Sequence, residues 1–592
     1  MRTALLLGTA IGVLEVALRA STQFGMSMAN VLLLAALSGL LMAIYAGAAG
    51  IVSMFLPFKP AGRHVRLGWV VAAIMCIQGA LWYRFESVLN LFARDPKVWG
   101  GLLGIALVSA VIGALIDTQL NRITAKIERL AIGVILLSLL LALGRSYQSH
   151  DGEAREDLHP NVLFVSLDTM RADALEPYGG TSTPLVQRLA DEGTVFEEAF
   201  APAPITEPSH LAMLTGLDPS NSGVVSNGTI IGDQPNLISR ALKRNGYTTA
   251  AFVAGFPLHS KYGWVQDFDV YDDDFGKTAG LHRLALVKAW DQFTLPGNTL
   301  RERRGDQVIE RSLNWLKTVE DQRWFAWVHL FDAHAPYEAP PPFAPETEPP
   351  RDGEPLALPE WWPPIHRSIT SIPWLLDAYH AEVRYIDALL QELVDFLEST
   401  EQLNDTLIVI TADHGESLTE HDYLFEHGDN LYDPSIRIPL IIRLPGVVRA
   451  QQRVPCQVSS VSVAQTILDI AHSHDKLERD GPSLVPVLTG ETCEERDVLA
   501  STVAGRFMEN PPVDHALRAR GRKLIRRTEG GNQLFDLTTD PGELINLYES
   551  TPDEAAALNV VLDAKLEGRG DVLGPQTDAQ TTEALRALGY VD

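Results

Sequence analysis

Apolar residues are concentrated in the first quarter of this chain. Five apolar runs lie within residues 1–146, whereas the remainder alternates shorter apolar runs with polar stretches. A helix that spans a bilayer needs about 20 apolar residues, and most of these runs approach that length. The pattern therefore predicts about five transmembrane helices, near residues 3–21, 30–56, 67–84, 99–117 and 130–144.

Basic residues between the apolar runs predict the orientation of these helices. With five spans, more basic residues collect on the side of the N-terminus than on the opposite side. Because basic flanks favour the cytoplasm, the last span would deliver the chain to the periplasm or the cell exterior. This depends on the first run being a span, although it carries Glu15 and Arg19. We therefore expect a multi-pass protein of the cell membrane, in contact with the lipid bilayer, whose soluble portion faces outward.

The soluble portion alternates strand-like and helix-like segments. A polar linker at residues 147–159 precedes the first of several short, apolar, β-rich runs, which are typical of buried strands. The clearest of them are residues 161–167, 324–330 and 406–411. Alternating strands and helices predict an α/β sheet sandwiched by helices over residues 160–447. A smaller C-terminal subdomain is expected over residues 448–592, with an antiparallel pair formed by residues 522–525 and 533–537.

Charge and cysteine content narrow the range of partners. The formal net charge is −27, which argues against nucleic acid as a partner and is compatible with divalent cations. Of the three cysteines, Cys76 lies in an apolar run. Cys456 and Cys493 can form a disulfide if their domain lies outside the cytoplasm, or can remain free.

Chemically reactive side chains follow two of the predicted strands. Asp168 comes directly after residues 161–167, and Asp413 and His414 follow residues 406–411. The carboxyl ends of strands are where α/β sheets place their functional groups, and Gly415 permits a sharp turn there. An aspartate after a strand can also act only as a cap. We expect Asp413 and His414 to reach one metal ion.

A Pro-rich approach leads into a helix at Thr206. Pro208 suits the first turn of a helix, and a hydroxyl residue just before it suits the N-terminus. Free N–H groups and the helix dipole favour an anion at this place. Thr206 is therefore either a helix cap or a nucleophile toward a phosphate or sulfate ester.

Three histidines accompany these motifs. His334, before Pro336, is expected in an irregular loop at the end of a strand, and His427 follows the turn of Asp413. His329 lies within an apolar strand and is expected in the core or in the layer behind a site. The aspartate-rich segment 267–275 is expected to be a surface loop rather than a metal site.

Five separated motifs resemble those of the alkaline phosphatase/sulfatase superfamily and occur in its order. They are NVLFVSLDTMRAD (161–173), PITEPSHLAMLTG (204–216), HLFDAHAPY (329–337), TADHGE (411–416) and the pair KLI (523–525) with QLFDL (533–537). The resemblance spans roughly residues 160–547. It implies a central sheet with flanking helices, a metal site at the edge of the sheet, and a C-terminal subdomain that completes the fold.

The resemblance also implies roles for individual residues. Asp168, Asp413 and His414 match metal ligands, and Thr206 stands at the position of the nucleophile, whose oxygen would also bind the metal. His334 and His427 match residues that contact the oxyanion or the leaving group, one of them acting as its acid.

The chain departs from the sulfatase pattern at three positions. Sulfatases place Cys or Ser at the position of Thr206 and oxidise it to formylglycine, a conversion that threonine cannot undergo. They place Arg at the position of His210, which is expected to contact the substrate. They also tend to have a second carboxylate where this chain has Thr169.

Threonine nucleophiles occur in the phosphotransferase branches of the superfamily. Phosphoethanolamine transferases and lipoteichoic acid synthases resemble this chain in having Thr and about five membrane helices before an outward catalytic domain. We therefore expect a membrane-anchored, metal-dependent hydrolase or phosphotransferase that acts on a lipid-linked or envelope phosphate ester. The alternatives are a sulfatase that works without formylglycine and an inactive binding or scaffold protein.

The expected cofactor is one divalent cation. The mixed oxygen and nitrogen ligands favour Zn²⁺ or Mn²⁺ over Ca²⁺, which prefers oxygen ligands. Such an ion would activate the Thr206 hydroxyl, which is a poor nucleophile by itself. A second metal bound by Asp332, His334 and His427 is the alternative.

Overall fold

The computed structural model describes residues 159–567, apart from residue 235 and residues 276–301, 360–361, 363–365, 475–477 and 504–511. The chain divides into two units, Met1–Glu153 with Gly276–Leu300 and Ala154–Phe275 with Arg301–Asp592. The fold described below belongs to the second unit.

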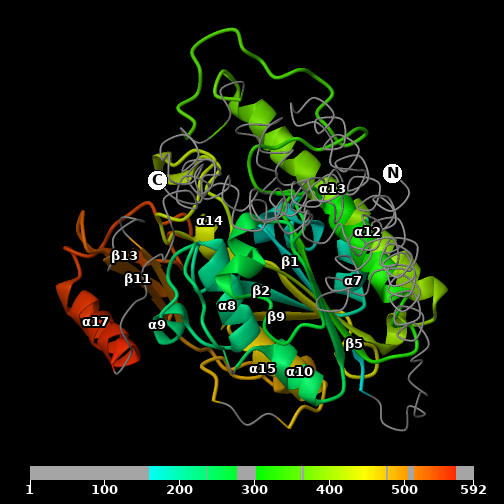
Figure 1. Ribbon diagram of the computed structural model, residues 1–592. Coiled ribbons are helices and arrows are strands. Elements are labelled where there is room, and N and C mark those ends of the chain that lie inside the picture. Colours follow the sequence, from blue (N-terminus) through cyan, green and yellow to red (C-terminus); the bar gives the residue numbers. More distant parts are fainter. Residues whose placement is uncertain are drawn as a thin grey trace, which may run out of the picture. The chain divides into compact units, whose positions relative to one another are not determined.

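A mixed sheet, nine-stranded among the described residues, forms the centre of this unit (Figure 1). Its parallel part has the order β4-β3-β5-β1-β6, and β8 and β2 continue it beyond β6, with β7 and β9 both paired to β2. The predicted strands are confirmed as the three neighbours β5, β1 and β6. The strands are β1 (Asn161–Leu167), β2 (Thr194–Phe200), β3 (Thr248–Phe252), β4 (Val270–Asp272), β5 (Trp324–Leu330), β6 (Thr406–Ala412), β7 (Arg437–Ile438), β8 (Leu440–Arg443) and β9 (Gln452–Ser459).

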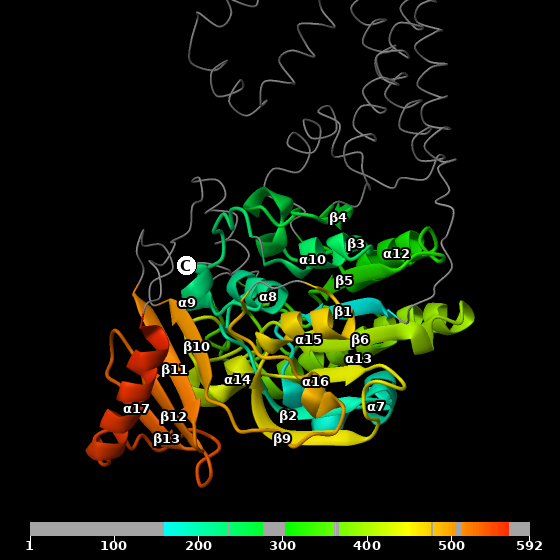
Figure 2. The same ribbon diagram turned by 90° about the horizontal axis from the view of Figure 1, so that it is seen from below.

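Helices cover both faces of the sheet, as predicted (Figures 1 and 2). One face carries α7 (Pro184–Asp191), α12 (Gly305–Leu316) and α13 (Ile372–Ser399), and the other carries α8 (Thr206–Thr215), α10 (Ile238–Arg244) and α15 (Ser462–Ile470). All ten residues of α8 are buried, which places this helix inside the unit rather than on its surface. Shorter helices are α9 (Pro219–Ser222), α14 (Asp433–Ile436) and α16 (Val485–Leu488).

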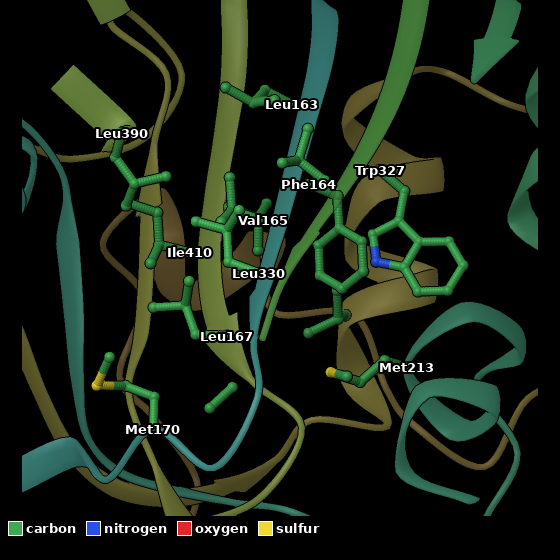
Figure 3. Close-up of a cluster of buried hydrophobic side chains, with 14 of the residues drawn as sticks. Leu163, Phe164, Val165, Leu167, Met170, Met213, Trp327, Leu330, Leu390 and Ile410 are labelled. Atoms are coloured by element: carbon green, nitrogen blue, oxygen red, sulfur yellow. The ribbon is translucent and has the colours of Figure 1, made fainter. Parts of the chain in front are cut away.

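The central strands are apolar because both of their faces are buried. Every residue of β1 is buried, and its side chains alternate between the two helix layers. Phe164 lies opposite Trp327 in the pairing of β1 with β5, and both side chains point toward Met213 of α8 (Figure 3). Burying a side chain of this size stabilises the fold by about 2–3 kcal/mol relative to exposure. This core holds the carboxyl end of β1 in place.

A second, antiparallel sheet lies beside the first. It contains β10 (Val498–Val503), β11 (Val513–Ala519), β12 (Arg522–Arg526) and β13 (Gln533–Asp536), in that order, and α17 (Pro552–Leu566) packs on β11 and β12 (Figure 2). The predicted antiparallel pair is confirmed as β12 and β13. Although β9 and α15 follow residue 447, they complete the central sheet and its helix layer.

Cys456 and Cys493 form a disulfide, with a Cα–Cα distance of 6.2 Å. Cys456 lies in β9 and Cys493 lies in the segment before β10. The disulfide resolves the alternative that the sequence left open.

The predicted fold class requires a correction in its membrane part. Among the described residues, no helix is both long enough and apolar enough to cross a bilayer. The longest, α13, has 28 residues but carries charged side chains along its length, including Asp377, Glu382 and Asp387. The five apolar runs of residues 1–146 lie outside the described residues, as do residues 147–158 of the predicted linker. The fold that the structure supports is an α/β sandwich with a second, smaller sheet.

Candidate active site

Asp168, Asp413 and His414 converge at the carboxyl ends of β1 and β6. The two strands are parallel neighbours, and Leu167 pairs with Ala412, so the residues that follow each strand lie side by side. His414 Nε2 is 3.8 Å from Asp168 Oδ1 and 3.5 Å from Asp413 Oδ2. All three side chains are fully buried. The structure therefore brings the predicted metal ligands together.

The orientation of these three side chains leaves ligand atoms available. Asp413 Oδ1 accepts hydrogen bonds from the backbone N–H groups of Thr169 (3.3 Å) and His414 (2.8 Å). His414 Nδ1 lies 2.9 Å from the carbonyl oxygen of Gly415, so Nδ1 is the donor and Nε2 keeps its lone pair. Both oxygens of Asp168, Oδ2 of Asp413 and Nε2 of His414 lack a hydrogen-bond partner among the described residues.

The raised pKa values of the two buried carboxyl groups indicate that this cluster needs a positive charge. Burial raises the pKa of Asp168, against the opposing effect of His334 and His414. Burial and the nearby Asp168 raise the pKa of Asp413 well above its usual range. Two buried carboxylates at such close quarters ionise at neutral pH only if a cation compensates them. The donor set and its unpaired atoms therefore fit a divalent cation, and these atoms lie within 4.8 Å of one another.

A second group of potential ligands, His210, His329 and Asp413, has the same spacing but less suitable protonation. His329 Nδ1 accepts the backbone N–H of Ala254 (3.2 Å), so Nε2 carries the proton and faces Asp168 Oδ2 at 3.3 Å. A protonated nitrogen cannot bind a metal. His329 thus lies beside Asp168 in the core without a hydrogen bond to it, a place that the sequence suggested for a histidine within a strand.

Thr206 is the first residue of α8, and Ile205 occupies the N-cap position. The Thr206 hydroxyl is fully buried and has no hydrogen-bond partner within the described part of the chain. Thr206 therefore does not cap the helix, and of the two roles predicted for it the helix cap is excluded. The first turn also offers few donors to an anion, because the N–H of Glu207 bonds to Asn227 Oδ1 (2.8 Å) and that of Ser209 bonds to Ile205 (3.2 Å).

His210 fastens the first turn of α8 to the sheet. Its Nδ1 donates to the carbonyl oxygen of Thr206 (2.8 Å), and its Nε2 accepts from the hydroxyl of Ser166 (2.9 Å). Ser209 Oγ donates to the carbonyl oxygen of Asp413 at 2.5 Å. The structure thus places His210 behind Thr206 with both ring nitrogens bonded within the protein, whereas the sequence predicted a contact with the substrate.

His334 and His427 lie on loops beside the predicted metal ligands. The centre of the His427 ring is 4.5 Å from that of His414 and 5.0 Å from that of His334. His334 Nδ1 bonds to the carbonyl oxygen of Ala335 (2.7 Å), and its ring stacks on Phe331. Burial lowers the pKa of His334 to about 4, although Asp168 opposes the shift. His334 is therefore neutral at pH 7, which argues against it as the acid.

Asp332 hydrogen-bonds to a neighbouring helix instead of the metal ligands. Its Oδ1 accepts the backbone N–H of Gly305 (3.0 Å) at the start of α12. Among the described residues, neither group of three close ligand atoms contains Asp332, His334 or His427. The aspartate-rich segment is not the surface loop that was predicted, because Val270–Asp272 form β4, which pairs with β3. Its Asp272 forms ion pairs with Arg303 and Arg311.

No role was predicted for Glu416, which is fully buried in this site. Its Oε1 lies 3.2 Å from Nδ1 of His427. Glu416 could have been identified from its place in the same turn as Asp413 and His414, within the TADHGE motif.

Comparison with known proteins agrees with this geometry. The Sulfatase family model matches residues 160–473, and the model for the C-terminal part of N-sulphoglucosamine sulphohydrolase matches residues 420–569. Arylsulfatase K of Gallus gallus is 27% identical over 491 residues, which cover 72% of this chain and 86% of that protein. Choline-sulfatase of Rhizobium meliloti (strain 1021) is 26% identical over 452 residues, covering 69% and 86%.

The fold of this chain is similar to that of solved hydrolase structures. The phosphonate monoester hydrolase of Agrobacterium radiobacter superimposes with a TM-score of 0.56 at 21% identity, covering 69% of this chain and 96% of that one. The Sulfatase family model alone spans more than half of the 592 residues. The chain therefore belongs to the sulfatase family, within the predicted superfamily, and is an ester hydrolase.

Proposed function

We propose that this enzyme hydrolyses a sulfate ester and that Thr206 supplies the attacking oxygen. The observation that carries the proposal is the buried hydroxyl of Thr206, to which no described residue hydrogen-bonds, on a turn that His210 and Ser209 tie to β1 and to Asp413. Arylsulfatase K and choline-sulfatase support sulfate as the group that is cleaved. These relatives favour a sulfate ester over the phosphate ester predicted from the threonine.

A divalent cation would be held by Asp168, Asp413 and His414. Such an ion supplies a Lewis acid, which increases the reactivity of a hydroxyl and neutralises charge on the ester oxygens. The fixed hydrogen bonds of Asp413 Oδ1 and His414 Nδ1 keep the remaining ligand atoms pointed at one place.

In the proposed reaction, Thr206 Oγ1 forms a bond to sulfur and loses its proton to water. The S–O bond to the alcohol breaks, and the alcohol oxygen takes a proton from His427. Water then attacks the same sulfur and the bond between sulfur and Thr206 Oγ1 breaks. One proton of this water restores the Thr206 hydroxyl, the other returns to His427, and sulfate leaves. His334, neutral because of its burial, contributes a polar contact rather than a proton.

Phosphate ester hydrolysis is the second candidate. Threonine cannot become an aldehyde, and a phosphothreonine is an intermediate that water or a second alcohol can resolve. The first step would be the same attack on phosphorus by Thr206.

Three chromogenic esters separate these candidates. Purified full-length protein should be assayed with 4-nitrophenyl sulfate, 4-nitrophenyl phosphate and bis(4-nitrophenyl) phosphate, with Zn²⁺, Mn²⁺ or Ca²⁺ added separately. We expect the highest kcat/KM for the sulfate. Turnover of a phosphate ester alone would replace the first candidate with the second.

We also propose that the catalytic domain lies outside the cytoplasm. The disulfide of Cys456 and Cys493 supports this location, because disulfides persist in oxidising compartments. Alkylation of thiols in intact cells, followed by mass spectrometry, should find both cysteines protected until a reductant is added. Two freely alkylated cysteines would contradict the proposal.

A further inference from the structure

We propose that Glu416 orients His427 toward the departing alcohol, so that the two side chains act as one proton-donating pair. This inference rests on the proposed ester hydrolysis and names a residue to which neither the motifs nor the comparisons assign a role. In the step, the S–O bond breaks and the proton on Nε2 of the His427 imidazolium passes to the alcohol oxygen. Oε1 of Glu416 retains its hydrogen bond to Nδ1–H throughout.

The first support is the contact between the two side chains. Glu416 Oε1 lies 3.2 Å from His427 Nδ1. Glu416 is fully buried and His427 is 6% exposed, so little water competes for this contact. A carboxylate that accepts from one ring nitrogen fixes the orientation of the imidazole and directs the other nitrogen away from itself.

The second support is the backbone that carries the pair. Ser417 N donates to the carbonyl oxygen of Glu426 (3.0 Å), and Glu426 N donates to that of Ser417 (3.1 Å). This reciprocal pair is an antiparallel bridge, and Glu416 and His427 are the residues that flank it on the same side. The contact between carboxylate and imidazole is therefore imposed by the register of a hairpin.

The third support is the anchoring of Glu416. Its carbonyl oxygen accepts from Arg171 Nη1 at 3.1 Å. The adjacent Gly415 donates its N–H to Ser435 (2.9 Å), and a Cβ on Gly415 would lie 2.1 Å from the carbonyl oxygen of Pro434. The turn that carries Asp413, His414 and Glu416 is thus held from two directions.

The position of the His427 ring completes the inference. It lies 4.5 Å from the His414 ring and 5.0 Å from the His334 ring, between centroids. Burying a carboxyl group is costly unless it is paired, and Glu416 Oε2 has no hydrogen-bond partner among the residues described. A carboxyl kept at this cost beside an active-site imidazole is better explained by its effect on that ring than by stability.

The test compares esters that differ in their need for a proton. The departing 4-nitrophenolate is stable without protonation, whereas phenolate and alkoxides gain much more from a proton donor. In the full-length protein, Glu416→Gln should lower kcat for phenyl sulfate by about 100-fold and kcat for 4-nitrophenyl sulfate by less than about 5-fold, with KM unchanged. His427→Ala should show the same pattern, and the double variant should lose little more than either single variant.

Glu420→Gln is the matched control, because Glu420 is a nearby carboxylate that pairs with Arg171 instead. It should leave both rates unchanged. Equal losses on the two sulfates in Glu416→Gln would overturn the pair while leaving the proposed hydrolysis intact. Failure of the unmodified protein to cleave either sulfate would overturn both.

Discussion

Asp168 and Asp413 occupy equivalent places at the ends of two paired strands. Each follows a residue of the last register pair of β1 and β6, Leu167 opposite Ala412. Both carboxylates are fully buried, and each presents at least one oxygen that no described residue hydrogen-bonds. The site therefore requires a bound cation, because adjacent buried carboxylates repel each other when both are ionised.

Removal of one ligand should therefore abolish metal binding. Purified wild-type protein is expected to contain about one divalent ion per chain, and Asp168→Asn should contain none, because one of the three protein ligands is lost. Elemental analysis after gel filtration measures this directly.

Asp332→Asn supplies the control for the metal measurement. Asp332 is a buried carboxyl on the neighbouring loop, but it binds the backbone of Gly305. Its metal content should equal that of the wild type. A lower content in Asp332→Asn would support a second metal site instead.

His210→Ala should destabilise the protein. The change removes two buried hydrogen bonds, to Thr206 and Ser166, and leaves a cavity, which together cost about 3 kcal/mol. Urea unfolding followed by circular dichroism measures the loss. Ser166→Ala removes the bond to His210 and the one that Trp327 Nε1 donates to Ser166 (2.9 Å), but it leaves a smaller cavity and should cost less. An unchanged midpoint for His210→Ala would show that the histidine does not hold the first turn of α8.

The sequence predicted the elements that carry the site better than the contacts between them. The runs ending at Asp168 and Asp413 were recognisable because central parallel strands are apolar throughout. Thr206 was recognisable because Pro208 marks the start of a helix. The partners of His210 and His329 depend on strand pairing and on helix packing across the sheet, so no local pattern could identify them.

The role of Glu416 was hidden for a related reason. Its partner, His427, is set opposite it by the bridge between Ser417 and Glu426, and the residues between them show no regular hairpin pattern. The prediction that α8 would offer free N–H groups to an anion was incomplete, since it did not foresee that Asn227 would accept one of them.

The contact between α14 and the second sheet, made by Asp433 with Arg518 and Lys523, should be sensitive to acid. Burial alone would raise the pKa of Asp433, but Lys523 and Arg518 lower it to about 2. Because the folded value lies below that of an unfolded aspartate, the ion pairs stabilise the protein above about pH 4 and lose this effect as pH falls toward 2.

Asp433→Asn tests this dependence. The difference in unfolding free energy between wild type and variant should be constant above about pH 5 and shrink by about 2 kcal/mol between pH 4 and pH 2. Denaturant titrations across this range measure it. A difference that does not change with pH would show that these charges do not contribute to holding the second sheet.

The central claim is that the Thr206 hydroxyl attacks the ester, and the most direct measurement compares Thr206→Val with Thr206→Ser. Valine keeps the branched shape without the oxygen, whereas serine keeps the oxygen. With 4-nitrophenyl sulfate as substrate and equal metal content in each protein, Thr206→Val should lose at least about 1000-fold in kcat and Thr206→Ser should retain measurable turnover. A Thr206→Val variant that turns over at the wild-type rate would contradict the account.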